Sequence, residues 1–350
     1  MNSTNYALPS GTNRRYDAVT FGEVMMRLSP NQNERLQNCQ TLRRYPGGSE
    51  LNIAAGLSML GLYTAMITRL PQNDAGSYIQ NAIISCGVQD DFIIQDTDSE
   101  SRVGIYFYEN GAYPRKPQVL YDRRHSAING VEIAEVLPEV YQSARLFHTS
   151  GISLAISEKP RRCAIELMRR FKQNGALISF DVNFRANLWS EEDARNTITS
   201  ILPLIDILFV SEETLRRTFR QTGTLEEILR AFAKANDISL IASTERKVLS
   251  PKCHNFTSTV YDAGKDSFFK EQEYEAIDVI DRVGSGDAYV AGALYGLLTE
   301  NDPLAMVKFG NAMSAIKSTV EGDLPSTSLK EVRAVIASHE GIGPQSELNR

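Results

Sequence analysis

The 350-residue sequence contains few of the side chains that bind zinc or form disulfide bridges. It has four cysteines and four histidines, and no two cysteines form a CxxC pair. The cysteines are spread along the chain, at Cys39, Cys86, Cys163 and Cys253, as are the histidines, at His125, His148, His254 and His339. This spacing argues against a disulfide framework and against a zinc module.

Long apolar runs and an excess of positive charge are also missing. The stretch 201–210 contains Pro203 and Asp206 and is far shorter than the roughly 18 apolar residues of a transmembrane helix. Residues 1–16 are polar and lack the apolar core of a secretory signal. With 37 Lys and Arg against 43 Asp and Glu, the net charge of −6 argues against a nucleic-acid or membrane partner. We therefore expect a cytoplasmic protein.

Short apolar runs alternate along the chain with amphipathic stretches of helical period. We expect strands at 17–21, 64–70, 146–150, 177–183, 205–210 and 239–242, and helices at 49–60, 74–85, 160–174, 193–202, 225–234, 287–298 and 304–320. This alternation predicts an α/β fold with a mostly parallel sheet that helices cover on both faces. Ligands of such sheets bind at the C-terminal ends of the strands.

Two segments, 25–45 and 102–123, contain no helical pattern. In the second segment Tyr106, Tyr121 and Arg123 fall on one side of a period-two alternation, which is typical of a half-buried antiparallel hairpin. We expect both segments to form a small β-sheet inserted into the α/β body. The alternation fits an ordinary edge hairpin as well as a lid that reaches over a ligand.

The sequence DRVGSGDA at 281–288 follows a strand-like stretch, 276–280, and precedes a helical run. Gly284 and Gly286 allow the backbone to approach a ligand without a Cβ in the way. The start of the next helix offers unpaired N–H groups to an anion. Asp287 would then lie beside a bound phosphate, where a base acts in phosphoryl transfer. The alternative is a plain strand-to-helix turn with Asp287 as a favoured cap or first-turn residue.

Two further polar motifs lie at predicted strand or helix ends. The sequence GGSELN at 47–52 is either a tight turn with Ser49 as a helix cap or a backbone approach to a polyol that Asn52 also contacts. In DVNFR at 181–185, Asp181, Asn183 and Arg185 share one side of the chain. Because three polar groups at the end of a buried strand are costly without partners, this motif favours a functional site.

In this order and spacing, the three motifs resemble the ribokinase-like (PfkB) carbohydrate kinase family. The resemblance spans about residues 17–325, and DRVGSGDAYVAGAL is similar to the C-terminal signature of the family, with Ser285 and Tyr289 in place of the usual Ala and Phe. It implies a ribokinase-like three-layer αβα body with a small β-sheet lid. The implied boundaries are 17–24, 46–101 and 124–335 for the body, 25–45 and 102–123 for the lid, and 1–16 and 336–350 for the tails.

Within the family, finer stretches resemble 2-keto-3-deoxygluconate kinases. They are GIYF at 104–107, VLYDR at 119–123, DVNFR with Leu188-Trp189, and Gly322-Asp323. The resemblance implies ATP-dependent phosphorylation of the terminal hydroxyl of 2-keto-3-deoxygluconate. The implied substrate-binding residues are Gly48, Asn52, Tyr106, Tyr121, Arg123, Arg185 and Asp323, and the two arginines suit a carboxylate. A fructokinase, a ribokinase and a non-catalytic sugar-acid sensor on the same fold stay open as alternatives.

The resemblance also assigns roles in phosphoryl transfer. Asp287 would accept the hydroxyl proton, and backbone N–H groups of Gly284, Ser285 and Gly286 would stabilise charge on the transferred group. The implied nucleotide-binding residues are Asn183, Arg185, Ser243, Thr244, Arg246, Gly284, Gly286 and Asn311. The implied cofactors are ATP and Mg²⁺, and a monovalent-cation requirement is left open. Because the lid of this family is often a dimer interface, we also expect a homodimer.

The sequence departs from the family pattern in two places. The N-x-x-E motif that helps to hold Mg²⁺ reads Ser211-Glu212-Glu213-Thr214, so that either Glu213 or Glu212 substitutes or the phosphates of the nucleotide hold most of the metal. The nucleotide-side loop at 243–247, usually a glycine-containing turn, has no glycine. Both departures concern the metal and nucleotide contacts and leave Asp287 in place.

Overall fold

Seven parallel strands form the centre of a ten-stranded sheet in the computed structural model, which describes residues 14–31 and 34–342. The strand order is β13 (Ser267–Lys270), β12 (Cys253–Asp262), β11 (Leu240–Ser250), β10 (Ile207–Phe209), β9 (Leu177–Asp181), β8 (Ala144–Ser150), β1 (Tyr16–Phe21), β4 (Thr64–Pro71) and β5 (Gln89–Asp96). β12 and β13 are antiparallel additions at one edge, and β14 (Tyr274–Asp278) also pairs with β12. The predicted α/β fold with a mostly parallel sheet is confirmed.

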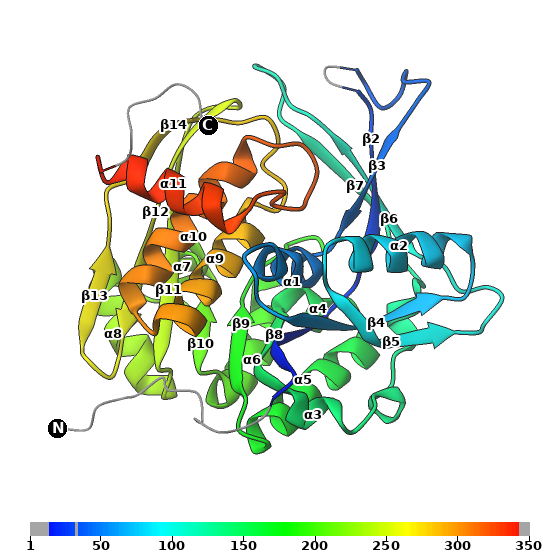
Figure 1. Cartoon of the computed structure of the whole chain (residues 1–350), viewed down its shortest axis with the longest axis horizontal. Helices are drawn as coiled ribbons and strands as arrows, with labels where there is room; N and C mark the ends of the chain where they lie inside the picture. The colour runs from blue at the N-terminus through cyan, green and yellow to red at the C-terminus, as the bar shows by residue number, and fades with distance from the viewer. Residues whose placement is uncertain (1–13, 32–33, 343–350) are drawn as a thin grey trace.

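Helices cover both faces of this sheet (Figure 1). One face carries α1 (Ser49–Met59), α2 (Asp74–Ser85), α9 (Ser285–Glu300), α10 (Pro303–Ser318) and α11 (Leu329–His339). The other carries α3 (Val140–Ser143), α4 (Gly151–Ala155), α5 (Glu158–Gln173), α6 (Glu191–Ile201), α7 (Glu212–Arg217) and α8 (Leu225–Asn236). Three short 3-10 helices lie at Ala127–Gly130, Ile133–Glu135 and Leu202–Leu204. Among the residues that the structure describes, no helix is both long and apolar enough to cross a bilayer.

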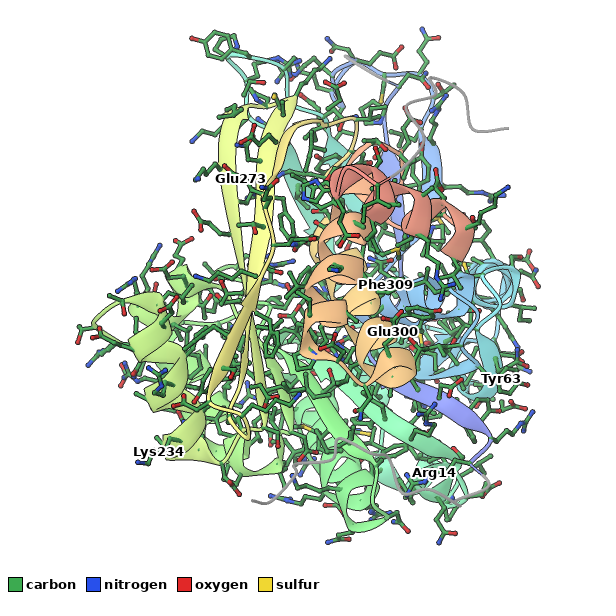
Figure 2. All side chains as sticks on the ribbon, turned by 60° about the vertical axis from the view of Figure 1, so that its left-hand side comes forward. Arg14, Tyr63, Lys234, Glu273, Glu300 and Phe309 are labelled. Carbon is green, nitrogen blue, oxygen red and sulfur yellow. The ribbon has the colours of Figure 1, made fainter. Side chains whose placement is uncertain are left out.

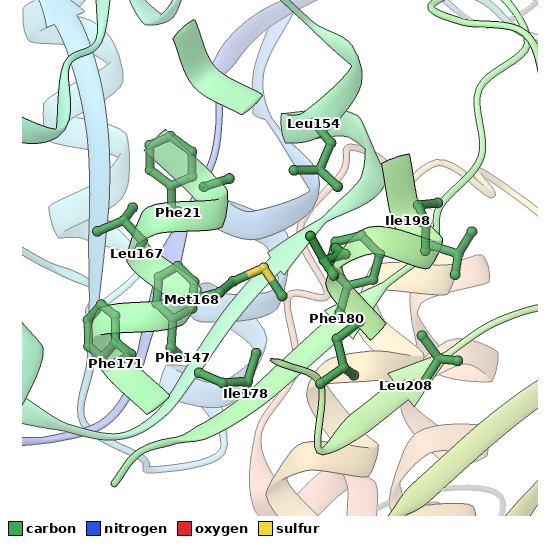
Figure 3. Close-up of a cluster of buried hydrophobic side chains, with 14 of the residues drawn as sticks. Phe21, Phe147, Leu154, Leu167, Met168, Phe171, Ile178, Phe180, Ile198 and Leu208 are labelled. Atoms are coloured by element: carbon green, nitrogen blue, oxygen red, sulfur yellow. The ribbon is translucent and has the colours of Figure 1, made fainter. Parts of the chain in front are cut away.

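Alternate residues of the central strands pack into the two helix layers, as the period of a strand requires. In β1, Val19 and Phe21 face the α5 and α6 layer, whereas Ala18 faces α1 and α9. Figure 3 shows the first layer, in which strand residues Phe21, Phe147, Ile178, Phe180 and Leu208 pack against Leu167, Met168, Phe171 and Ile198 of α5 and α6. Since burying one such side chain contributes about 1.5–3 kcal/mol, this core fixes the strand ends that carry polar side chains.

A separate four-stranded sheet forms from the two segments that showed no helical pattern. Its order is β3 (Arg43–Gly47), β2 (Met25–Ser29), β6 (Gly104–Glu109) and β7 (Gln118–Asp122), with β2 and β6 parallel and the other pairs antiparallel. In Figure 1 this sheet rises from one end of the body, beyond α1 and α2. Tyr106 pairs with Tyr121 across β6 and β7, as the predicted hairpin requires.

The structure differs from the predicted elements where polar sequence adopts strand structure. β5, with the sequence QDDFIIQD, was not predicted, because its polar residues mask the apolar ones. β11 was predicted to end at 242 but continues to Ser250, and together with β12 it forms a long hairpin. The strand-like stretch predicted at 276–280 overlaps β14, an edge strand at Tyr274–Asp278 that is antiparallel to β12.

The sequence predicts tails at 1–16 and 336–350 on either side of the body. Residues 1–13 and 343–350 of the predicted tails lie outside the described part of the chain. α11 continues to His339 and packs on the core, so the body extends past residue 335, where the C-terminal tail was predicted to follow. The remaining division into body and lid stays a prediction.

Candidate active site

A cavity of about 870 Å³ opens at the C-terminal ends of β9 and β10, beneath the smaller sheet and in front of the first turn of α9. Most of the predicted site residues line it: Gly48, Asn52, Tyr106, Tyr121, Arg123, Asn183, Arg185, Glu213, Thr244, Arg246, Gly284, Ser285, Gly286, Asp287 and Asp323. We call the part lined by Tyr106, Tyr121, Arg123 and Asp323 the sheet end, after the smaller sheet. We call the part lined by Thr244, Arg246 and Arg282 the hairpin end, after the β11–β12 hairpin. The position at the strand ends agrees with the prediction from the α/β pattern.

The Asp287 carboxylate is held by two side chains of α1. Its Oδ1 accepts a hydrogen bond from Ser49 Oγ at 2.7 Å, and its Oδ2 accepts one from Asn52 Nδ2 at 2.7 Å. Ser49 Oγ in turn accepts from Asn183 Nδ2 at 2.9 Å. Neither α1 nor α9 has a side-chain cap bond, so Ser49 and Asp287 are not helix caps, although Asp287 does lie in the first turn of α9. Both side chains instead form a hydrogen bond with each other at the cavity wall.

Two carboxylates share this part of the cavity. Burial raises the pKa of Asp287, while the hydrogen bonds from Asn52 and Ser49 oppose that rise. Burial, reinforced by the negative charge of Asp287, raises the pKa of Asp181 to about 7. Since two nearby carboxylates disfavour each other's ionised form, the proton affinity of one depends on the other. Asp181 was noted at the sequence level for its position beside Asn183 and Arg185 but was not assigned a role.

Two glycines lie at the start of α9, Gly284 as its N-cap and Gly286 in its first turn, and the fold requires only the first of them. Gly284 has φ 82°, and a Cβ there would lie 2.0 Å from the backbone oxygen of Asp323, so the fold itself requires glycine. A Cβ on Gly286 would meet no atom within 4 Å. Nothing in the described protein therefore requires glycine at 286, and the missing side chain leaves open space in front of the helix N-terminus.

One of the three predicted backbone donors in this turn is already used. The Ser285 N–H donates to the Arg282 carbonyl at 3.2 Å, so Ser285 is a poorer anion donor than predicted. Among the described residues, the N–H groups of Gly284, Gly286 and Asp287 have no hydrogen-bond acceptor. Together with the helix dipole, these groups form a site for an anion beside the Asp287 carboxylate.

At the sheet end, Tyr106, Asp323 and Arg123 are already paired with other protein groups. Tyr106 donates a hydrogen bond to Asp323, whose other oxygen binds Arg27 at 2.9 Å. Arg123, predicted to bind a free carboxylate, forms a buried ion pair with Glu23. Its charge is therefore largely balanced inside the protein, whereas Arg185 forms no ion pair within the described residues. Sequence reasoning missed Arg27 and Glu23, because neither lies in a recognisable motif.

At the hairpin end, two arginines lack acidic partners. Arg246 on β11 and Arg282 before α9 form no ion pair in the described part of the chain. Burial, with the positive charge of Arg282 nearby, lowers the pKa of the Arg246 guanidinium. Like charges without a counterion favour an anionic ligand between them. Arg282 was part of a quoted motif but was not predicted as a site residue.

Two predicted nucleotide contacts lie elsewhere. Ser243 is buried and does not line the cavity, because side chains alternate along β11 and those of Ala242 and Thr244 are the ones that face it. Asn311 is fully buried in α10, where its Nδ2 donates to Glu271 Oε1 at 2.7 Å. Neither side chain is placed to contact a ligand in this cavity.

The carboxylates at the start of α7 do not form a metal cage. Glu213 lines the cavity but is exposed and paired with Arg217 at 2.9 Å, and Glu212 is paired with Arg216 at 2.6 Å. Ser211, at the position of the family's Asn, caps α7 through the Thr214 N–H. Among the described residues, no group of three or more His, Cys, Asp or Glu side chains is arranged to hold a metal ion. This donor set fits Mg²⁺ only if phosphates supply most of its ligands.

Known proteins resemble this chain in both sequence and fold. Residues 16–329 match the pfkB family carbohydrate kinase. The chain is 32% identical over 320 residues to the 2-dehydro-3-deoxygalactonokinase of Haloferax volcanii, covering 91% of this chain and 96% of that protein. It is 28% identical over 329 residues to the probable fructokinase-3 of Arabidopsis thaliana, covering 91% and 90%. The crystal structure of the 2-dehydro-3-deoxygluconokinase of Thermotoga maritima superposes with a TM-score of 0.87 at 29% identity, covering 93% and 99%.

Proposed function

The chain belongs to the pfkB family of carbohydrate kinases, and is thus a phosphotransferase with an alcohol acceptor; we propose that it transfers the γ-phosphoryl group of ATP to the terminal hydroxyl of 2-keto-3-deoxygluconate or a closely related sugar acid. The observation that carries the proposal is the position of Asp287. Its carboxylate is held by Ser49 and Asn52 beside the open space at Gly286 and the free N–H groups of α9.

In the proposed reaction, the substrate hydroxyl lies against Asp287. The hydroxyl oxygen forms a bond to the γ-phosphorus, the bond from that phosphorus to the bridging oxygen of ADP breaks, and the hydroxyl proton passes to Asp287. The raised pKa of Asp287 helps it to hold that proton. The N–H groups of Gly284 and Gly286, with that of Asp287, stabilise the charge on the transferred group.

The two ends of the cavity suit the two substrates. At the sheet end, Tyr106, Tyr121 and Asp323 present hydroxyl and carboxylate groups to a polyol. Arg185, which has no ion pair among the described residues, is the best partner for the carboxylate of a sugar acid, with the Glu23-paired Arg123 beside it. Gly48, whose φ of 154° and contact with the Glu23 backbone exclude a side chain, brings its own backbone to the cavity wall.

The hairpin end suits the nucleotide. Thr244, Arg246 and Arg282 line it, and Asn183, which donates to Ser49, also lines the cavity. Mg²⁺ on the phosphates would neutralise part of their charge, and Glu213 and Glu212 are the cavity residues that could reach it through water. Because the cytoplasm supplies the ATP that such a kinase uses, we propose a cytoplasmic location.

A coupled assay of ADP release over a panel of sugars and sugar acids tests the substrate. We expect kcat/KM for 2-keto-3-deoxygluconate or 2-keto-3-deoxygalactonate to exceed that for fructose and ribose by at least about 100-fold, because a buried polar site rejects analogues that leave it unpaired. A higher value for fructose would replace the sugar-acid proposal with the fructokinase alternative. Binding of the acid without any turnover of ATP would favour a sensor.

We also propose a homodimer through the outer face of the smaller sheet. Leu36, Leu42, Phe107 and Leu120 surround an apolar hollow of about 470 Å³ on that face, and Leu120 is 60% exposed. A second copy would cover this surface, since a small sheet seldom leaves an apolar face in water. Light scattering after size exclusion should give twice the chain mass for the wild type and the chain mass for Leu120→Lys. A monomeric wild type would refute this interface.

A further inference from the structure

Arg27 carries a guanidinium that is buried in the junction between the smaller sheet and the body. The residue lies in the middle of β2 and is 1% exposed. Its Nη2 binds Asp281 Oδ2 at 2.6 Å, its Nη1 binds Asp323 Oδ1 at 2.9 Å, and its Nε donates to Ser29 Oγ at 2.8 Å. The guanidinium also lies 4.3 Å from the ring centre of Tyr108. Every nitrogen of the fork is therefore bound, and its orientation is fixed.

The two carboxylates that bind Arg27 also accept hydrogen bonds from two different walls of the cavity. Asp281 accepts the Val283 N–H at 3.1 Å and the Gly322 N–H at 3.1 Å, so it shapes the turn that begins α9. Asp323 accepts the hydroxyl of Tyr106 at the sheet end. One guanidinium thus connects the wall proposed to hold the sugar acid with the turn proposed to hold the phosphoryl group.

Stability alone is a poor explanation for this network. The Lys317 ammonium is also buried there and donates to the backbone oxygens of Asp281 and Val320 at 3.0 and 3.1 Å. Two buried cations and two buried carboxylates balance in charge, but well-packed apolar side chains often stabilise a protein as much as or more than such a network. Burial opposes the charge of Arg27, and Asp323 and Asp281 together raise its pKa, so it stays ionised. What the network supplies beyond apolar packing is fixed geometry.

We propose that Arg27 is a positioning residue, which sets the spacing between Tyr106 and the 284–287 turn and so aligns the acceptor hydroxyl with the phosphoryl group. It does not touch either substrate and acts through Asp281 and Asp323. The inference rests on the proposed function, because that function places one substrate at each of these two walls. A misalignment of the order of 1 Å can lower the rate of a group transfer about 100-fold.

The test is Arg27→Lys, which keeps the positive charge but has one ammonium and cannot bridge both carboxylates with a rigid fork. The matched control is Arg69→Lys. Arg69 also bridges two carboxylates, Asp96 at 3.2 Å and Glu135 at 3.4 Å, but it lies outside the cavity. We expect Arg27→Lys to lower kcat about 10- to 100-fold and to change the KM values for ATP and the sugar acid less than about 3-fold. Arg69→Lys should leave kcat within about 2-fold.

Amide hydrogen exchange measures how firmly Arg27 holds the two walls, and it requires no turnover of substrate. Arg27→Lys should speed exchange in both 104–109 and 282–287, and Arg69→Lys in neither. The proposal is overturned if kcat of Arg27→Lys stays within about 2-fold, if Arg69→Lys loses as much activity, or if only one of the two segments exchanges faster. If Arg27→Lys fails to fold, Asp281→Asn, which is isosteric and does not line the cavity, should show the same two effects in milder form. A wild type that phosphorylates nothing in the panel refutes the proposed function, while the exchange result still decides the role of Arg27.

Discussion

The sheet end and the hairpin end of the cavity differ in whether their charged groups have partners within the protein. At the sheet end, Tyr106 is paired with Asp323, Asp323 with Arg27, and Arg123 with Glu23. At the hairpin end, Arg246 and Arg282 have no acidic partner within the described residues. A wall of paired groups holds its shape before the ligand arrives, whereas a wall of unpaired cations is completed by an anion. The proposed acceptor would bind at the wall of paired groups, and the proposed phosphate donor at the wall of unpaired cations.

The largest expected effect comes from Asp287, which lies between the two ends. Asp287→Asn removes the proton acceptor but keeps a group that Ser49 and Asn52 can bind, so the fold should be unchanged. We expect kcat to fall by about 10²- to 10⁴-fold. Asp74→Asn is the control, because Asp74 is also an acidic residue in the first turn of a helix, α2, but lies away from the cavity. Steady-state kinetics with both substrates saturating measures the effect. A fall of less than about tenfold would mean that Asp287 is not the base.

The two glycines of the 284–287 turn separate a structural role from a ligand role. Gly286→Ala should leave thermal stability unchanged or slightly higher, because the Cβ meets nothing within 4 Å, but should lower kcat about 10- to 100-fold by occupying the space of the phosphoryl group. Gly284→Ala should cost about 1–3 kcal/mol of stability, because φ is 82° and the Asp323 oxygen is too close. Thermal melts and kinetics of both variants decide the point. Full activity in Gly286→Ala would argue against phosphate binding there.

A crossed pair of arginine variants tests whether the two ends bind different substrates. Arg123→Ala should raise KM for the sugar acid by about tenfold or more and affect KM for ATP less, whereas Arg246→Ala should do the reverse. Since Arg123→Ala leaves Glu23 without its partner, Arg123→Ala with Glu23→Gln serves as the control for an unpaired buried charge. Equal effects of each variant on both KM values would remove the distinction between the ends.

The smallest expected effect is the pH dependence that Asp181 adds to stability. Its folded pKa of about 7 lies above that of an unfolded Asp, so the folded state binds the proton more tightly. This contribution is complete below about pH 4 and is lost as pH rises through about 7. Asp181→Asn should therefore melt about 2–4 °C higher than the wild type at alkaline pH and at nearly the same temperature at about pH 4. Thermal melts across this range give the answer, with the exposed Asp74→Asn as baseline. A difference independent of pH would show that Asp181 does not titrate as stated.

Local sequence pattern was sufficient for the body of the fold and for most of the cavity wall. The predicted helix 74–85 coincides with α2, and the motifs at 47–52, 181–185 and 281–288 all meet at the cavity. Ser243 and Asn311, which the family resemblance implies as nucleotide contacts, are buried and do not line the cavity, because a family position does not say which side of β11 or α10 faces the ligand. The sequence left a helix cap open as a role for Ser49, whereas its partners in the fold are Asp287 and Asn183.

The parallel α/β architecture and the residue types at the site could be predicted from the sequence, because the strand period, the helix period and the glycine-rich turns are patterns of neighbouring residues. Which charges are free and which are balanced depends instead on residues that the fold brings together from distant parts of the chain. Arg27 and Asp323 are 296 positions apart in the chain, and Arg123 and Glu23 are 100 apart. No local pattern predicts such pairs, because burying an arginine is favourable only when distant carboxylates are brought to it by the packing of the whole sheet.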